Sequence, residues 1–144
     1  MKKMFVAAGI FSLSAFVASN AFAEGDVAKG EAVFKKCTAC HQIGPEAKNK
    51  VGPQLNGIVG RQIASVEGYK YGKDIVALGE TGATWTKEEL FEYLKDPKKY
   101  LRAKLDNKKT KSKMSAKFKK EDDRNNVIAY LESLQPAEEA ATTN

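Results

Sequence analysis

The sequence predicts an all-α fold with long loops, and three observations lead to that class. Four segments place apolar residues at helical spacing, and most of them begin with a capping signal. No segment alternates apolar and polar residues cleanly enough for a strand, and none resembles a βαβ unit. Glycine and proline recur throughout residues 44–72, which predicts a long loop. Because the chain contains so little helix, its long loops need a further group against which they can pack.

The first 23 residues are typical of an export signal peptide. An early pair of lysines precedes an uncharged apolar run, and Ala21-Phe22-Ala23 fits an A-x-A cleavage site. The run from Met4 to Ala18 is shorter than the roughly 20 residues that span a bilayer, which disfavours an uncleaved membrane anchor. We therefore expect cleavage after Ala23, a periplasmic location, one domain over residues 24–135 and a flexible tail over residues 136–144.

The first helices are predicted on either side of the long loop. Asp26 is expected to cap a helix whose apolar positions, from Val27 to Cys37, fall near helical spacing. After the loop, the apolar stretch DIVAL, residues 74–78, is long enough for one or two helical turns.

Two helices follow directly on one another in the centre of the chain. Thr86 and Glu89 have the spacing of a capping box, and Pro97 ends the helix that they begin. Asp96 and Pro97 are a typical N-cap and first residue, which predicts a second short helix over residues 98–105.

A last helix is expected from about Glu121 to Leu134. Its acidic first turn suits the positive end of the helix dipole. Its predicted buried face consists of Val127, Ile128, Leu131 and Leu134.

The chemistry of the chain centres on CTACH, residues 37–41, for which three functional interpretations and one purely structural interpretation exist. A dithiol redox pair follows a strand in an α/β protein, and no strand is predicted here. A zinc site needs four ligands, but residues 24–144 contain no further Cys or His. A plain disulfide closes a very small loop and gives His41 no role. C-x-x-C-H is also the attachment sequence of haem c, which uses Cys37, Cys40 and His41 together: two thiols for the vinyl groups and an imidazole for the iron. We therefore predict one covalently bound haem c.

Met114 is the only methionine after residue 23. Its surroundings, KKTKSKMSAKFKK, are too polar for a core segment, so we predict that it binds the iron opposite His41. Such His/Met ligation raises the reduction potential and leaves no open iron position, which favours an electron carrier over an enzyme. The alternatives are a c-type haem enzyme or gas sensor with an open axial position, in which a lysine or water replaces Met114, and a disulfide-bonded binding module without haem.

The chain resembles the class I c-type cytochromes and, among them, the bacterial cytochrome c2 group. The resemblance covers nearly all of residues 24–135. It is carried by the stretches FKKCTACH, VGPQLNGIVGR, EGYKYGKD, GATWTKEELFEYLKDPKKYL, KSKM and NNVIAYLESL. It implies the class I cytochrome c fold, with three main helices, short helices and long loops wrapped around one haem.

The resemblance also implies roles for residues around the histidine and between the helices. The Pro53 carbonyl is expected to accept a hydrogen bond from the ring N–H of His41 and so orient this ligand. Gly30 is expected to let the first helix approach the last one closely, opposite Val127 and Tyr130.

Further roles concern the haem propionates and the methionine. Tyr71 and Trp85 are expected to bond a buried propionate, with Arg61 nearby to offset its charge. Tyr93 is expected to lie beside the sulfur of Met114.

The charge distribution predicts a strongly dipolar molecule. Residues 95–120 contain twelve basic and two acidic residues, whereas the rest of residues 24–144 is net acidic. A run of charge is commonly only a solvated surface, and a weak contact with anionic lipid is a further alternative. We expect instead a basic face around Met114 that binds acidic patches transiently. The candidate docking residues are Lys35, Lys36, Lys98, Lys99, Lys104, Lys108, Lys109, Lys111, Lys113 and Lys117.

The resemblance implies the partners. The expected donor is the cytochrome bc1 complex, and the expected acceptor is a photosynthetic reaction centre or a terminal oxidase. We expect a monomer that forms short-lived complexes. The export signal excludes nucleic acid as a partner.

Overall fold

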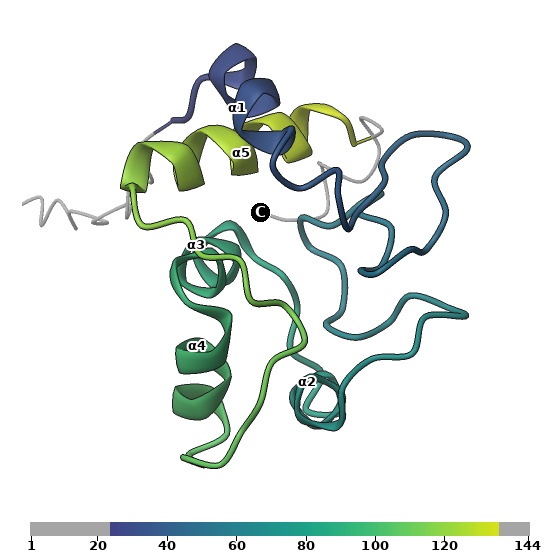
Figure 1. Cartoon of the computed structure of the whole chain (residues 1–144), viewed down its shortest axis with the longest axis vertical. Coiled ribbons are helices and arrows are strands. Elements are labelled where there is room, and N and C mark those ends of the chain that lie inside the picture. Colours follow the sequence, from purple (N-terminus) through teal and green to yellow (C-terminus); the bar gives the residue numbers. More distant parts are fainter. Residues whose placement is uncertain (1–23, 136–144) are drawn as a thin grey trace, which may run out of the picture.

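The computed structural model describes residues 24–135, which form a helical structure with long loops (Figure 1). Its helices are α1 (Val27–Phe34), α2 (Lys73–Gly79), α3 (Lys87–Lys95), α4 (Pro97–Lys104) and α5 (Glu121–Ser133). In this described part the only β-type pairing is an isolated bridge between Gln62 and Thr84. The predicted all-α class is thus confirmed. The predicted signal peptide, residues 1–23, and the predicted C-terminal tail, residues 136–144, lie outside the described residues.

None of the helices in residues 24–135 is long and apolar enough to span a membrane. Even α5 has only 13 residues, against the roughly 20 that a spanning helix needs.

Helices α1 and α5 lie side by side at one end of the molecule, although they come from opposite ends of the chain (Figure 1). A Cβ atom on Gly30 would lie only 2.0 Å from the carbonyl oxygen of Asn126 and 2.7 Å from Cβ of Tyr130, so only glycine permits this approach. The nearest atoms therefore belong to Asn126 and Tyr130, and Val127 is not the closest neighbour. The N–H of Asp26 donates to Oδ1 of Asn126 at 2.7 Å, which closes the contact.

Helix α1 ends at Phe34, so Cys37, which we counted among its apolar positions, lies outside the helix. The chain continues in tight turns, in which Cys37 N–H donates to the Phe34 carbonyl at 2.7 Å. The His41 N–H then donates to the Cys37 carbonyl at 2.9 Å. The CTACH stretch thus adds one helical turn of its own outside α1, which brings Cys37 and His41 to the same side.

The caps predicted for α3 and α4 are present. Oγ1 of Thr86 accepts a hydrogen bond from the Glu89 N–H at 3.1 Å, and Oδ1 of Asp96 accepts one from the Lys99 N–H at 3.0 Å. Pro97 is the first residue of α4, as expected. These local signals place both helix starts correctly because they depend on neighbouring residues alone.

Only one of the two hydrogen bonds of the predicted capping box of α3 is present, the one from the Glu89 N–H to Thr86. The Glu89 carboxylate does not cap the helix but accepts hydrogen bonds from the Tyr100 hydroxyl and from Nζ of Lys104, the latter at 2.5 Å. Burial raises the pKa of Glu89, but the bonds from Lys104 and Tyr100 and the Lys104 charge outweigh it, so the pKa lies below its ordinary value. Glu89 therefore joins α3 to α4.

The buried face of α5 differs from the expected one at two positions. Val127, Ile128 and Leu131 are buried as predicted, but Leu134 is 48% exposed because the helix has already ended. Arg124 is buried instead, at 1% exposure, with its guanidinium carbon 4.1 Å from the centre of the Phe91 ring. An arginine is rarely buried without partners, so its position on this face follows from the contacts described below.

Candidate functional site

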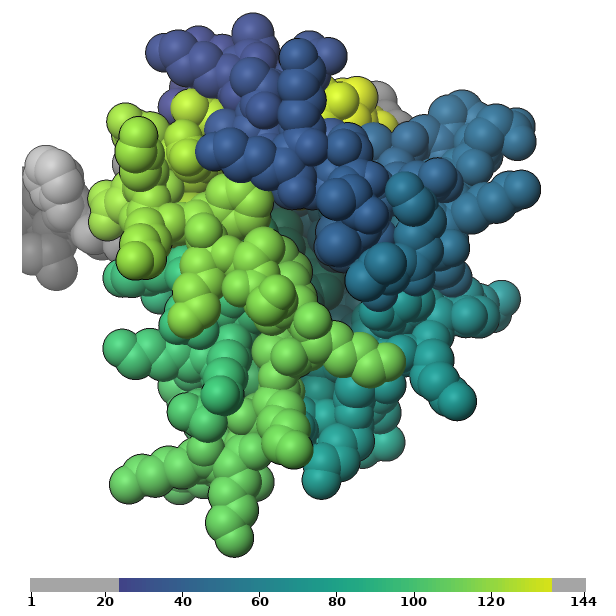
Figure 2. All heavy atoms as spheres, in the orientation of Figure 1, coloured from purple at the N-terminus to yellow at the C-terminus, as the bar shows by residue number. Residues whose placement is uncertain are grey.

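One pocket lies between the long loops and the segment that joins α4 to α5, and it is visible as a hollow in the surface (Figure 2). Every residue that we expected to bind the haem lines this pocket, although these residues are spread from residue 37 to residue 114 of the sequence. They are Cys37, Cys40, His41, Pro53, Arg61, Tyr71, Trp85, Tyr93 and Met114.

The His41 ring is oriented by a hydrogen bond to the backbone. Its Nδ1 lies 2.7 Å from the carbonyl oxygen of Pro53. A carbonyl can only accept, so Nδ1 carries the proton and donates, and the lone pair is on Nε2. Burial lowers the pKa of His41, and the bond to Pro53 opposes this shift without cancelling it. The ring is therefore neutral at neutral pH, with Nε2 available to a metal.

Gly52 forms the surface against which this ring lies, a role that we did not predict. A Cβ at Gly52 would be 2.3 Å from Cε1 of His41, so no other residue fits without displacing the ring. The Gly52 N–H donates to the Cys40 carbonyl at 2.8 Å, and the Leu55 N–H donates to the Gln42 carbonyl at 3.0 Å. Backbone bonds therefore hold the CTACH turn against the loop that carries Pro53.

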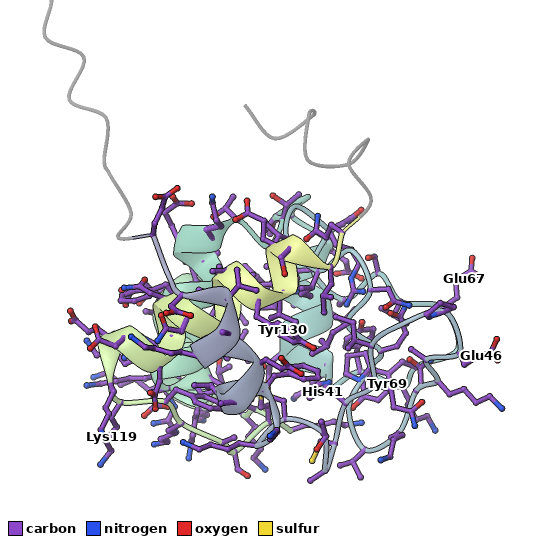
Figure 3. All side chains as sticks on the ribbon, turned by 90° about the horizontal axis from the view of Figure 1, so that it is seen from above. His41, Glu46, Glu67, Tyr69, Lys119 and Tyr130 are labelled. Carbon is purple, nitrogen blue, oxygen red and sulfur yellow. The ribbon has the colours of Figure 1, made fainter. Side chains whose placement is uncertain are left out.

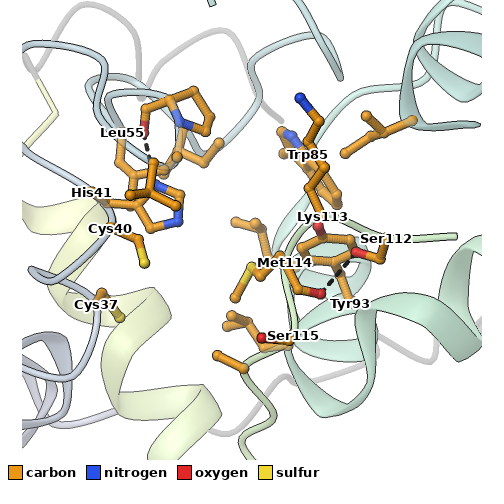
Figure 4. Close-up of a pocket in the computed structure, with 18 of the residues that line it drawn as sticks. Cys37, Cys40, His41, Leu55, Trp85, Tyr93, Ser112, Lys113, Met114 and Ser115 are labelled. Atoms are coloured by element: carbon orange, nitrogen blue, oxygen red, sulfur yellow. Dashed lines mark hydrogen bonds between the residues drawn. The ribbon is translucent and has the colours of Figure 1, made fainter. Parts of the chain in front are cut away.

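Cys37 and Cys40 are free thiols on the same wall as His41 (Figure 4). Burial, followed by repulsion from Cys40, raises the pKa of Cys37 to about 11, against an opposing effect of Lys36. The Cys37 thiol is therefore uncharged at neutral pH. Within residues 24–135 no three Cys, His, Asp or Glu side chains gather as a metal site.

Met114 lies on the opposite wall, with its sulfur directed toward the side that carries His41 and the cysteines (Figure 4). Its carbonyl oxygen accepts a hydrogen bond from the Ser112 hydroxyl at 2.9 Å. Tyr93 lies on this wall too. Burial raises its pKa to about 12, although a hydrogen bond with Ser112 acts in the other direction. We did not predict a role for Ser112, since nothing in its sequence surroundings distinguishes it from other loop serines.

Arg61 and Trp85 are neighbours because their backbones pair. The Trp85 N–H donates to the Arg61 carbonyl at 2.8 Å, beside the isolated β-bridge. The Arg61 guanidinium donates to the carbonyls of Asn56 and Gln54 at 2.7 and 3.1 Å, which fixes its direction. The Tyr71 hydroxyl accepts a hydrogen bond from the Val66 N–H at 3.3 Å. The three predicted polar side chains thus line one pocket.

The apolar walls of the pocket were mostly not identifiable from the sequence. They consist of aliphatic and aromatic residues that are spread from the long loop to the last helix. These residues are Leu55, Ile58, Ile75, Leu90, Leu94, Leu101, Phe118, Val127 and Leu131. Tyr69 also lines the pocket, and its hydroxyl donates to the Val51 carbonyl at 2.7 Å. Its only sequence signal is its place beside Tyr71 in EGYKYGKD.

All ten candidate docking lysines are exposed, but they differ in position and in pairing. Lys36, Lys111 and Lys113 line the pocket, whereas the other seven do not. Lys104 is paired with Glu89 at 2.5 Å, and Lys117 is paired with Asp96 at 2.6 Å. The charges of these two lysines are therefore partly neutralised.

The donor set of the pocket fits a haem group. Two free thiols, an imidazole with its free nitrogen available and a thioether face one another, within walls that would cover a flat apolar ring. Imidazole and thioether are ligands that haem iron takes in electron-transfer proteins.

Comparisons with known proteins agree with this chemistry. The Cytochrome c family model matches residues 27–135. Cytochrome c2 of Rhodospirillum rubrum is 45% identical over 135 residues, which cover 94% of this chain and 100% of that protein. Cytochrome c2 of Rhodobacter capsulatus is 43% identical over 140 residues, which cover 93% and 98%. The solved structure of cytochrome c2 from Rhodospirillum centenum matches with a TM-score of 0.74 and 46% identity, covering 78% of this chain and all of that one.

The resemblance found in the sequence is therefore confirmed along almost the whole chain. Proteins of the c2 group are electron carriers and not enzymes, and their family implies a covalently attached haem c; two cysteines, Cys37 and Cys40, are present in this chain. The chain belongs to the cytochrome c family and, within its class I members, to the c2 group.

Proposed function

We propose that this protein is a periplasmic one-electron carrier whose haem iron is bound by Nε2 of His41 and by the sulfur of Met114. The observation that carries the proposal is the opposition of these two side chains across one pocket, with both cysteines on the histidine wall (Figure 4). The haem would supply a one-electron change at its iron. The residues around it would keep both axial positions filled, so that no external ligand or substrate can bind there.

The protein itself orients the proposed iron ligands and excludes water from the pocket. The hydrogen bond from His41 to Pro53 fixes the ring before any metal binds, and the apolar walls keep the pocket dry. Ligands that need not move between oxidation states favour fast electron transfer. Arg61, Tyr71 and Trp85 line the same pocket, which supports their expected role around a propionate.

The distribution of charge supports a docking role for the basic face. Lys36, Lys111 and Lys113 line the pocket, and residues 95–120 carry most of the excess positive charge. Glu46 and Glu67 project from the outer loops, on the side of the molecule away from Lys119 (Figure 3). Such a dipole would steer the carrier toward acidic patches on membrane redox complexes. The proposed donor is a cytochrome bc1 complex, and the proposed acceptor is a reaction centre or a terminal oxidase.

The absorption spectrum of the exported protein, oxidised and then reduced, tests this proposal. We expect a c-type spectrum when reduced and, when oxidised, the weak long-wavelength band of a methionine–iron bond. The Met114→Ala variant should keep the haem and lose that band. Haem without the band in the native protein would favour an open-position enzyme or sensor. A colourless protein would reject the haem assignment altogether.

A further inference from the structure

Met114 lies in a segment, residues 111–117, that is held by side-chain contacts, some made by its own residues and some by residues of other elements. None of the described backbone groups of this segment forms a hydrogen bond with another backbone group. Regular backbone bonding resumes at Phe118, whose N–H donates to the Leu94 carbonyl at 2.9 Å. Since backbone pairing does not fix the position of Met114, that position depends on side-chain contacts: the bond from Ser112 to the Met114 carbonyl within the segment, and the contacts that hold its two ends.

The first end is held by Asp74, which belongs to α2. Its Oδ2 accepts a hydrogen bond from the backbone N–H of Lys111 at 2.9 Å, across 37 residues of sequence. The preceding residue, Thr110, is 1% exposed, and its carbonyl accepts a bond from Nε of Arg102 at 3.3 Å. The chain therefore enters the segment from a buried residue and is tied to α2 at the next residue.

The second end is held by Arg124, which belongs to α5. Its NH1 group donates to the carbonyls of Phe118 and Lys119 at 2.7 and 2.9 Å. Its guanidinium lies over the Phe91 ring, and the side chain is 1% exposed. Because a buried arginine leaves few alternative conformations, these two carbonyls are fixed relative to α3 and α5.

We propose that Asp74 and Arg124 are positioning residues that set the strength of the Met114–iron bond, without touching the iron or the haem. This inference rests on the proposed ligation by Met114. When either anchor is lost, the segment gains freedom, and the state in which Met114 is bound becomes less favoured. The geometry of His41 is unaffected, since the bonds to Pro53 and around Gly52 involve neither anchor.

Imidazole added to the oxidised, haem-loaded protein measures this effect. It must displace Met114, so its apparent affinity rises by the factor by which the Met114–iron bond is weakened. We expect Asp74→Ala to bind imidazole about three- to tenfold more tightly than the native protein, as for the loss of one hydrogen bond. Asp74→Asn keeps an acceptor oxygen and should remain close to the native value. Arg124→Lys keeps the charge but not the contact with both carbonyls. The affinity of this variant for imidazole should therefore rise at least as much as that of Asp74→Ala.

Combining Asp74→Ala with Met114→Ala distinguishes a positioning role of Asp74 from any other effect of its substitution. In that background there is no Met114–iron bond to weaken, so Asp74→Ala should leave the imidazole affinity unchanged. Equal affinity in the native protein and in Asp74→Ala, with Met114→Ala much tighter, would overturn the positioning role and leave the ligation intact. If the native protein already binds imidazole as tightly as Met114→Ala, the ligation by Met114 itself fails. Since Arg124 is buried, urea unfolding must show that its variant is folded; otherwise Asp74→Ala decides the question.

Discussion

The two walls of the pocket are built in different ways. On the histidine wall, backbone bonds join the CTACH turn to the following loop, and the Gly52 backbone lies directly against the His41 ring. On the methionine wall, residues 111–117 depend on contacts with side chains such as Asp74, with Arg124 just beyond the segment. Turns that are joined by backbone hydrogen bonds have little freedom to move. Side-chain contacts, in contrast, can be removed one at a time by substitution. We therefore expect the histidine wall to be the more rigid of the two, and the proposed adjustment of the site concerns the methionine wall.

The largest effect should come from a methyl group added to the rigid wall. In Gly52→Ala the new Cβ meets His41 at 2.3 Å, and neither the ring nor the backbone can yield without losing hydrogen bonds. We expect a loss of about 3 kcal/mol of unfolding free energy, measured by urea denaturation. Gly72→Ala is the matched control near the other wall, because its Cβ would meet Lys113 at an ordinary 3.6 Å. Equal effects of the two substitutions would contradict the difference between the walls.

A smaller effect is expected on electron transfer, and it should depend on the wall that carries the charge. Lys111→Gln removes a charge that lines the pocket, whereas Lys48→Gln removes one from the outer loop of the histidine side. The rate of oxidation by ferricyanide, a small anion, should fall about two- to threefold for Lys111→Gln at low ionic strength. High salt should abolish the difference. An equal decrease for Lys48→Gln would show that only the net charge matters.

The smallest effect concerns acid stability near the methionine segment. The hydrogen bond from Lys117, followed by that from the Lys99 N–H, holds the pKa of Asp96 below its ordinary value of 3.8. A carboxyl whose pKa is lowered by folding stabilises the folded state above its unfolded pKa, and this contribution disappears as the pH falls through the folded pKa. The native protein should therefore exceed Asp96→Asn in stability at pH 6, and the difference should shrink as the pH falls below 3.8 and vanish once the pH is below the lowered folded pKa. Urea denaturation at both pH values measures this, and a constant difference would exclude the carboxylate as its source.

Much of the fold follows from local sequence signals. Thr86 and Asp96 mark the starts of α3 and α4 because a cap depends only on the next few residues. The pocket residues were predictable for a different reason: CTACH and the lone Met114 favoured a haem site over its alternatives, and the family resemblance implied the other pocket residues. That they line one pocket was expected from the family resemblance and not from any local pattern.

The remaining features depend on distant contacts. Arg124 looks like a surface residue in the sequence, and only the carbonyls of Phe118 and Lys119 give it a buried place. Glu89 has the right spacing for a capping box, but Tyr100 and Lys104 bind its carboxylate. In both cases a partner from another element determined the outcome, which no pattern within one helix can reveal.

The packing of α1 on α5 has a consequence for the order in which the protein can be assembled. Asp26 and its partner Asn126 are 100 residues apart, so α1 is synthesised long before the helix that Gly30 needs. Until α5 has been made, α1 lacks the helix against which it packs, so the contact between α1 and α5 is among the last to form. Attachment of the proposed haem to Cys37 and Cys40 would therefore not have to wait for this last contact.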